Sequence, residues 1–244
     1  MTAEGDTLDK KATEFADQLT ALTRGVLGED SPRFSALNVG NRIRVAPLAS
    51  DLRIVRFPVR INAERCLNLL VQHFCCWDGT RKYLAVDKTE IHVFYDGGSD
   101  PLMRYEYERG GENPPGAHLH VHAHRDEMAY VLRLADRKGR PRTGMRSGKL
   151  PRLAEMQFSV GGHRMRPALE DVLLLLEREF AVDVEPGWRG VVNEQQREWR
   201  LLQMKSAVRD AHEHAAETLR EIGYVVERTD NVMAQKPDSR LYRP

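Results

Sequence analysis

Histidine alternates with apolar residues in one short segment, and this alternation constrains the fold more than any other feature of the sequence. Four of the nine histidines lie there, as His118, His120, His122 and His124. Successive side chains of a β-strand point to opposite faces of the sheet. We therefore predict a strand over 117–124 with one apolar face and one face, the histidine face, that carries all four imidazoles.

Segments rich in Tyr, Val, Ile and Phe precede this strand at 81–86, 90–95 and 102–108. Short connections containing Asp, Gly and Pro separate them, which is typical of turns between antiparallel strands. Two shorter runs, 43–45 and 52–59, also have strand composition. The sequence therefore predicts an antiparallel meander of about four strands that ends in the histidine strand.

The residue pattern within the meander predicts which side chains accompany the histidines. If the apolar faces of the strands are buried together, Ile91, Val93 and Tyr95 belong to the buried face. The histidine face then gains the side chains that alternate with the apolar ones: His92, Phe94, Arg104, Glu106 and Glu108.

Helices are predicted on both sides of the meander. Apolar residues at three- and four-residue steps indicate a helix over about 8–26, closed near Gly28. Asn62 fits the N-cap of a second helix that reaches to about residue 78. Further helices are predicted from Asp126, from Pro167, over about 191–209 and over about 212–222. The predicted fold class is α+β, with a helical C-terminal region.

Changes in composition divide the chain into four parts. Residues 1–137 are predicted to form an α+β domain that includes the N-terminal helix, and 138–152 a basic loop. Residues 153–230 are predicted to form a mostly helical region packed on that domain, followed by a tail at 231–244.

The histidine face has three interpretations, which the sequence leaves open. It is the solvated side of a half-exposed sheet, or a site that binds a phosphate-containing ligand. Alternatively it holds a transition metal, because alternating imidazoles can surround such an ion with Glu106 or Glu127 as a carboxylate partner. A metal is therefore an alternative cofactor, although we assign no residue as its ligand from the sequence.

For phosphate chemistry, the candidate catalytic residues are His118, His120, His122 and Arg104. An imidazole titrates near neutral pH and can therefore serve as an acid or a base. The planar guanidinium of Arg104 matches the geometry of phosphate oxygens.

The alternating run His118-Leu119-His120-Val121-His122 resembles the corresponding strand of the histidine triad nucleotide hydrolases and transferases. In that family the middle histidine of the triad attacks phosphorus, and the flanking histidines position the phosphate and the leaving group. The resemblance implies the attacking role for His120. It covers about seven residues, and this sequence departs from the family after Ala123, where it has His124 instead of an apolar residue.

A wider resemblance covers about residues 80–226. It is carried by the runs Tyr83–Lys88, Pro101–Tyr107, Ala117–Asp126 and Val160–Pro167, followed by Leu169–Leu173. These runs are similar to a family of uncharacterised actinobacterial proteins. No activity is established for that family, so the resemblance implies no residue roles.

A basic segment follows the helix predicted from Asp126. Between Arg137 and Arg152 there are seven Lys and Arg residues and no acidic residue. Guanidinium groups bind phosphate oxygens in pairs of hydrogen bonds, although a solvated loop is the alternative. The candidate phosphate-binding residues are His124, Arg140, Arg142 and Arg146.

The composition limits the function classes. With 37 Lys and Arg against 36 Asp and Glu, the formal charge is +1, which excludes nucleic-acid binding through bulk charge alone. No apolar run approaches the roughly 20 residues of a membrane-spanning helix. We therefore expect no membrane partner. The three cysteines do not form a disulfide framework, which favours a cytoplasmic protein.

The sequence therefore predicts a protein that binds or acts on a phosphate-containing ligand, nucleic acid or nucleotide, through the histidine face. The competing prediction is a non-catalytic module that contacts a protein partner through its C-terminal helices. A metal-dependent enzyme with histidine ligands is the third. Whether the chain is an enzyme at all is left open.

Overall fold

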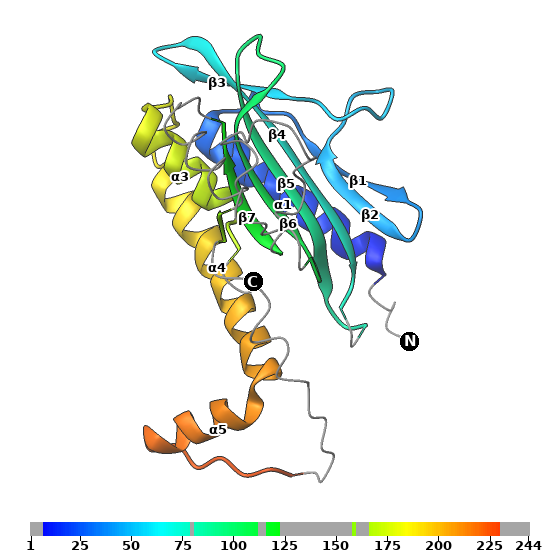
Figure 1. Ribbon diagram of the computed structural model, residues 1–244, viewed down its shortest axis with the longest axis vertical. Coiled ribbons are helices and arrows are strands. Elements are labelled where there is room, and N and C mark those ends of the chain that lie inside the picture. The colour runs from blue at the N-terminus through cyan, green and yellow to red at the C-terminus, as the bar shows by residue number, and fades with distance from the viewer. Residues whose placement is uncertain (1–6, 79–80, 112–115, 123–157, 160–165, 230–244) are drawn as a thin grey trace, which may run out of the picture.

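An antiparallel sheet with a long helix across one face organises the chain (Figure 1). The computed structural model describes residues 7–78, 81–111, 116–122, 158–159 and 166–229. The sheet has eight strands in the order β1-β2-β4-β5-β6-β7-β8, and β3 pairs with β4 beside this path. The fold class is α+β, as predicted, but the sheet is larger than a meander of about four strands.

The strands are β1 Phe34–Val39, β2 Arg42–Pro47, β3 Phe57–Ile61, β4 Glu64–Trp77, β5 Leu84–Tyr95, β6 Pro101–Glu108, β7 Ala117–Val121 and β8 Phe158–Ser159. The described helices are α1 Leu8–Leu27, α3 Leu169–Phe180, α4 Trp188–Asp210 and α5 His212–Glu221. These bounds confirm the helices predicted near the N-terminus and over 191–222. The helix predicted from Asp126 lies outside the described residues.

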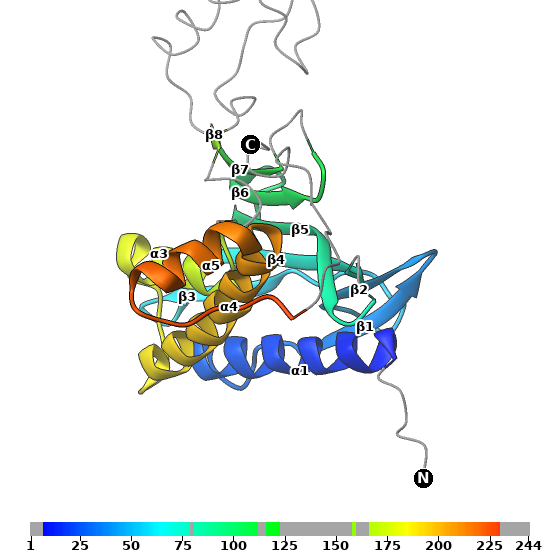
Figure 2. The same cartoon turned by 90° about the horizontal axis from the view of Figure 1, so that it is seen from below.

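The helix α1 forms as its sequence pattern predicts. The hydroxyl of Thr7 caps its first turn by accepting a hydrogen bond from the backbone N–H of Lys10 at 3.2 Å, and Gly28 ends it at a φ of 98°. Its apolar stripe is buried against the sheet, mostly over β1 and β2. Figure 2 shows the sheet rising away from α1, with β7 and β8 farthest from the helix.

The helix predicted from Asn62 to about residue 78 is wrong, because this segment is the 14-residue strand β4. Leu67, Leu69 and Val71 are buried and alternate with more accessible residues, which is the period of a strand. Asn62 and its neighbour Ala63 have positive φ values of 52° and 66° and form the tight turn between β3 and β4. Asn62 therefore begins the turn of the β3–β4 hairpin and does not cap a helix.

Two predicted strands merge into the single strand β5, which includes residues 84–86 of the first and all of 90–95. The strand pairs with β4 along most of its length. Strand β6 confirms the prediction over 102–108, and β7 confirms the first part of the histidine strand. Of the run 52–59, only the end belongs to a strand, since β3 begins at Phe57.

The helical C-terminal region shares the core of the sheet. Leu169, Val172 and Leu176 of α3 are buried in the same hydrophobic cluster as residues of α1, β4 and β5. Helix α4 packs against α1, and the Arg166 guanidinium lies 4.5 Å from the ring centre of Tyr107 on β6. Within the described part of the chain, no helix combines the length and the apolar character needed to cross a membrane.

Candidate functional site at the histidine strand

The pairing of β5, β6 and β7 brings the polar residues of the histidine face together, as predicted. Glu106 lies opposite His118, and Arg104 lies opposite His120. On the other side of β6, His92 of β5 lies opposite Arg104. Because directly paired residues of antiparallel strands have adjacent side chains on the same face, these five groups form one cluster.

The carboxylate of Glu106 is the centre of this cluster. Its Oε1 lies 3.0 Å from His92 Nε2 and 3.4 Å from Arg104 Nη1. Its Oε2 lies 3.2 Å from His118 Nε2 and 3.5 Å from His120 Nε2. One carboxylate thus faces one guanidinium and three imidazoles, and each of its oxygens has two of these neighbours.

These neighbours keep Glu106 ionised. Burial by itself would raise the pKa of this carboxyl group, because an ion loses hydration in the protein. Hydrogen bonds from His118 and His92 and the charge of Arg104 outweigh burial and hold the pKa of Glu106 far below its usual range. The cluster therefore contains a permanent negative charge surrounded by groups that carry or can acquire a positive one.

The histidines at the centre are not solvated. His118 is 3% exposed and His120 is 5% exposed, and their rings meet nearly edge to face with centroids 4.9 Å apart. Polar groups are rarely buried without a structural or chemical role. A solvated strand face would expose its histidines, so this interpretation does not fit His118 and His120.

Two polar atoms at the edge of the cluster have no hydrogen-bond partner among the described residues. They are Arg104 Nε and His122 Nε2, and both are shielded from solvent. The backbone N–H of His122 donates to the carbonyl of Leu102, which places the His122 side chain diagonally beside Arg104. Burial lowers the pKa of His122, and the charges of Arg104 and His120 lower it further.

Three groups of the cluster have the chemistry and the spacing of metal ligands. A carboxylate oxygen of Glu106 and one ring nitrogen each of His118 and His120 all lie within 4.8 Å of one another. No other such group of three occurs in the part of the chain that the structure describes.

The structure therefore brings together four predicted site residues, His118, His120, His122 and Arg104. The predicted phosphate-binding residues His124, Arg140, Arg142 and Arg146 lie outside the described residues, as does Glu127. The sequence placed His92 on the histidine face but not in the site. Its contact with Glu106 follows from the register between β5 and β6, which the alternation alone does not give.

The end of β5 differs from the prediction. Tyr95, expected on the buried face, is exposed, whereas Phe94 is buried. β5 stays in regular register with β4 up to Tyr95, which is the last residue of the strand. The pairing of β5 with β6 shifts between Val93 and Phe94, and the extra residue, Leu102, lies on β6. The guanidinium of Arg56 lies 3.6 Å from the ring centre of Phe94.

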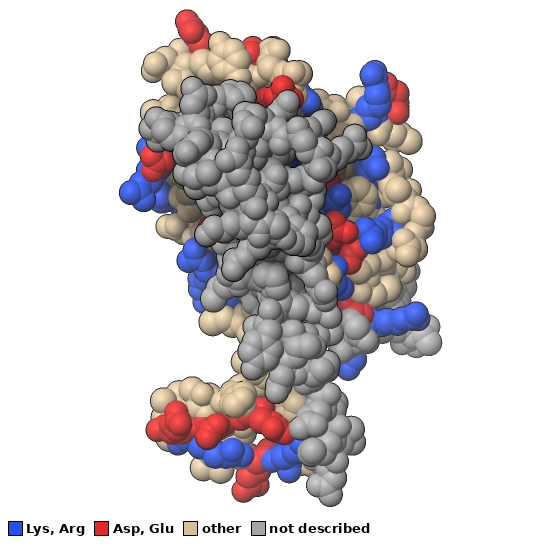
Figure 3. All heavy atoms as spheres, in the orientation of Figure 1, with Lys and Arg blue, Asp and Glu red and all other residues tan. Residues whose placement is uncertain are grey.

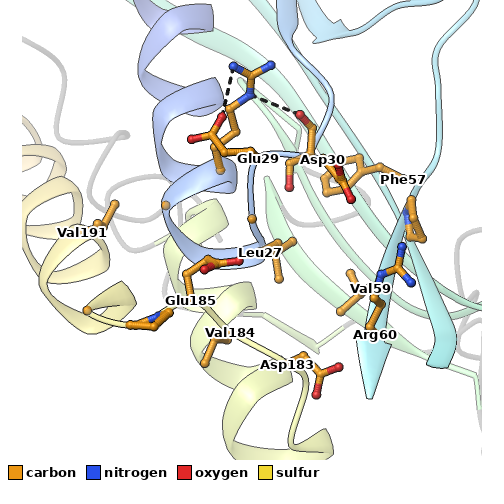
Figure 4. A pocket seen from close by; sticks show the side chains of 17 residues that line it. Leu27, Glu29, Asp30, Phe57, Val59, Arg60, Asp183, Val184, Glu185 and Val191 are labelled. Atoms are coloured by element: carbon orange, nitrogen blue, oxygen red, sulfur yellow. Dashed lines mark hydrogen bonds and ion pairs between the residues drawn. The ribbon is translucent and has the colours of Figure 1, made fainter. Parts of the chain in front are cut away.

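A cavity of about 690 Å³ lies away from the histidine face, between the end of α1, strand β3 and the segment before α4. Figure 4 shows Phe57, Val59 and Arg60 of β3 on one side and Val184 and Glu185 on another. One of its charged groups, Asp183, accepts hydrogen bonds from two backbone N–H groups of the β3–β4 turn. The residues of the histidine cluster do not line this cavity.

Comparisons with protein-family models, with curated proteins and with solved structures found no match. The similarity to an actinobacterial family and to the histidine triad proteins thus stays a prediction from the sequence. Any functional conclusion has to come from the geometry of the cluster.

Proposed function

We propose that this protein binds and acts on a phosphate-containing ligand, a nucleic acid or a nucleotide, at the cluster around Glu106. The observation that carries the proposal is the buried Nε of Arg104, which has no partner among the described residues although it lies beside a fully engaged carboxylate. A buried guanidinium N–H without a partner is costly. A phosphate oxygen is the acceptor that guanidinium groups bind best.

The ligand would lie over Arg104, within reach of its Nε and of the imidazoles beside it. Arg104 directs Nη1 to Glu106, which leaves Nε to donate to the phosphate. His122 lies diagonally across from Arg104. Its Nε2 is also buried without a partner among the described residues. Its Nε2 is placed to exchange a proton with a hydroxyl group or a water molecule that attacks the phosphate.

Glu106 has a positioning role in this scheme. A carboxylate with a strongly lowered pKa is a weak base, so we assign proton transfer to His122 and not to Glu106. Glu106 instead fixes His118 and His120, so that the electrophilic side of the site consists of these two imidazoles and Arg104. The developing negative charge on the phosphate would be stabilised there.

Binding is tested by calorimetric titration of the whole protein with inorganic phosphate, a mononucleotide and a short RNA. Replacing Arg104 by Met removes the Nε donor to a charged acceptor, a hydrogen bond worth about 1.5–3 kcal/mol, and should weaken binding at least 10-fold. Arg189→Met is the matched control, because Arg189 is an exposed arginine on α4. Equal affinity in both variants, or no saturable binding of any of the three ligands, would refute the proposal.

Turnover is tested separately with phosphodiester oligonucleotides. His122→Gln should retain phosphate binding and lose turnover, whereas His214→Gln, at an exposed histidine of α5, should match the wild type. If His122→Gln cleaves as fast as the wild type, His122 is not the proton-transfer group.

A protein contact through the C-terminal helices is the second candidate, and one observation favours it. Large apolar side chains at the end of α4 and beyond α5 are exposed, among them Val208, Ile222 at 66% and Val225 at 90%. Figure 3 shows acidic and basic side chains interspersed along α5, which does not suit a polyanion. A photo-crosslinking residue at position 222 should trap a partner protein in cells, whereas one at the exposed Asp51 should not.

A further inference from the structure

We propose that Glu106, His118 and His120 together bind one divalent transition-metal ion, of the kind that Zn²⁺ represents. The inference rests on the proposed function for the purpose of the ion, but the ion-binding geometry stands by itself. The donor atoms are Oε2 of Glu106 and Nε2 of both histidines.

The distances between these atoms fit a tetrahedral ion. Zinc binds imidazole nitrogen at about 2.0–2.1 Å and carboxylate oxygen at about 2.0–2.2 Å, so tetrahedral donors lie roughly 3.4 Å apart. Glu106 Oε2 lies 3.2 Å from His118 Nε2 and 3.5 Å from His120 Nε2. The three donor atoms all lie within 4.8 Å of one another, so shifts of the two imidazoles would bring the set to tetrahedral spacing.

The orientation of the rings also fits. The imidazole planes of His118 and His120 are inclined by 72°, so the rings are not stacked and both Nε2 atoms approach the same oxygen. Glu106 on β6 and His118 on β7 are directly paired, and His120 on β7 lies diagonally from Glu106. Ligands on neighbouring strands are held more rigidly than ligands on loops.

The other carboxylate oxygen of Glu106, Oε1, is held by two neighbouring side chains. Oε1 accepts from His92 Nε2 at 3.0 Å and lies 3.4 Å from Arg104 Nη1, and these contacts direct Oε2 toward the two histidines. Metal-ligating carboxylates are usually hydrogen-bonded in this way. His92, which the sequence did not mark as a site residue, becomes a positioning residue of the metal site.

The charges decide what completes the coordination. An ion of charge +2, Glu106 and Arg104 sum to +2, so the open fourth position favours an anion. Three protein ligands with an open position are typical of catalytic zinc sites, whereas structural sites use four. The ion would then polarise an oxygen of the phosphate that Arg104 holds, and His118 and His120 would serve as ligands while His122 stays the proton-transfer group.

The test measures metal binding directly and needs no activity. Full-length protein is stripped with a chelator and titrated with Zn²⁺ by calorimetry and with Co²⁺ by visible absorption, which distinguishes four-coordinate from hydrated cobalt. Wild type and the control His214→Ala should bind one equivalent with the spectrum of tetrahedral Co²⁺. Glu106→Gln and His120→Ala should bind at least 100-fold more weakly, and His92→Gln about 10-fold more weakly.

Several outcomes would overturn the proposal. They are no stoichiometric binding by the wild type, an unchanged affinity in Glu106→Gln, or an octahedral cobalt spectrum. Circular dichroism identifies any variant that does not fold, and the near-isosteric Glu106→Gln keeps the test valid if His120→Ala fails. Phosphate titration of the stripped protein separates the two proposals, since binding that depends on Arg104 without metal supports the proposed function even if the metal site fails.

Discussion

The contacts of Glu106 predict that this residue stabilises the folded protein as well as the site. Its carboxylate accepts hydrogen bonds from His92 at 3.0 Å and from His118 at 3.2 Å. A hydrogen bond to a charged group contributes about 1.5–3 kcal/mol, and truncation also leaves Arg104 without its ion-pair partner. Because the carboxylate is about one-fifth exposed, we take the lower end and expect Glu106→Ala to cost about 3 kcal/mol. For a chain of this length, that loss lowers the melting temperature by about 6–12 °C.

A double-mutant cycle assigns this energy to a specific pair. Glu106→Gln, His118→Gln and the double variant are unfolded with urea at pH 7 in the presence of a chelator, followed by tryptophan fluorescence. Neighbours in one network typically couple by about 0.5–3 kcal/mol. The exposed pair His214 and Glu217, 3.8 Å apart on α5, is the control and should show no resolvable coupling.

The reasoning fails if the Glu106–His118 coupling is as small as that of the control pair. It also fails if Glu106→Ala is as stable as the wild type, because the imidazoles and the guanidinium would then not depend on the carboxylate.

Three further predictions concern residues outside the cluster. Burial, and to a smaller extent the charge of Arg166, lower the pKa of His73 to about 3. Between pH 6.5 and 3 the unfolded chain therefore binds a proton that the folded protein does not. The free energy of unfolding falls as the pH drops through this range. His73→Gln should lose less stability than the wild type between pH 7 and 4 in urea titrations, and parallel curves would contradict this. Gly28→Ala should lower the thermal stability by about 1–3 kcal/mol, because its φ of 98° suits glycine, whereas Gly190→Ala within α4 should raise it by about 0.5–1 kcal/mol. Asp183→Ala should destabilise by about 1–3 kcal/mol in urea unfolding, because two N–H groups of the β3–β4 turn lose their acceptor, and an unchanged midpoint would show that the turn does not need it.

Much of the fold was predictable where one periodicity dominates the sequence. The apolar stripe of α1 and the alternation in β6 and β7 each match only one kind of element. In β4 the spacing of Leu67, Leu70 and Val71 suits a helix, but the same segment also alternates with a period of two. Its strand form is supported by the turn at Asn62, whose backbone is bound by Asp183, a residue 121 positions away along the chain. That contact cannot be inferred from local sequence.

The composition of the site was predictable, but its geometry was not. Alternation alone placed Arg104, Glu106, His92 and the histidines on one face. The central position of Glu106 depends on the registers of β5 with β6 and of β6 with β7, which involve two separate turns. The burial of His118 and His120 is likewise a property of the packed structure, because the same alternation is typical of a solvated strand.

The central claim is that the cluster around Glu106 binds phosphate, and nuclear magnetic resonance of the histidine side chains tests it most directly. Inorganic phosphate is titrated into labelled, chelator-treated protein, with resonances assigned from single histidine variants. We predict saturable shifts for His120 and His122 that disappear in Arg104→Met, while the exposed His214 does not shift. Saturable shifts at His214 alone, or identical titrations of the wild type and Arg104→Met, would contradict the account.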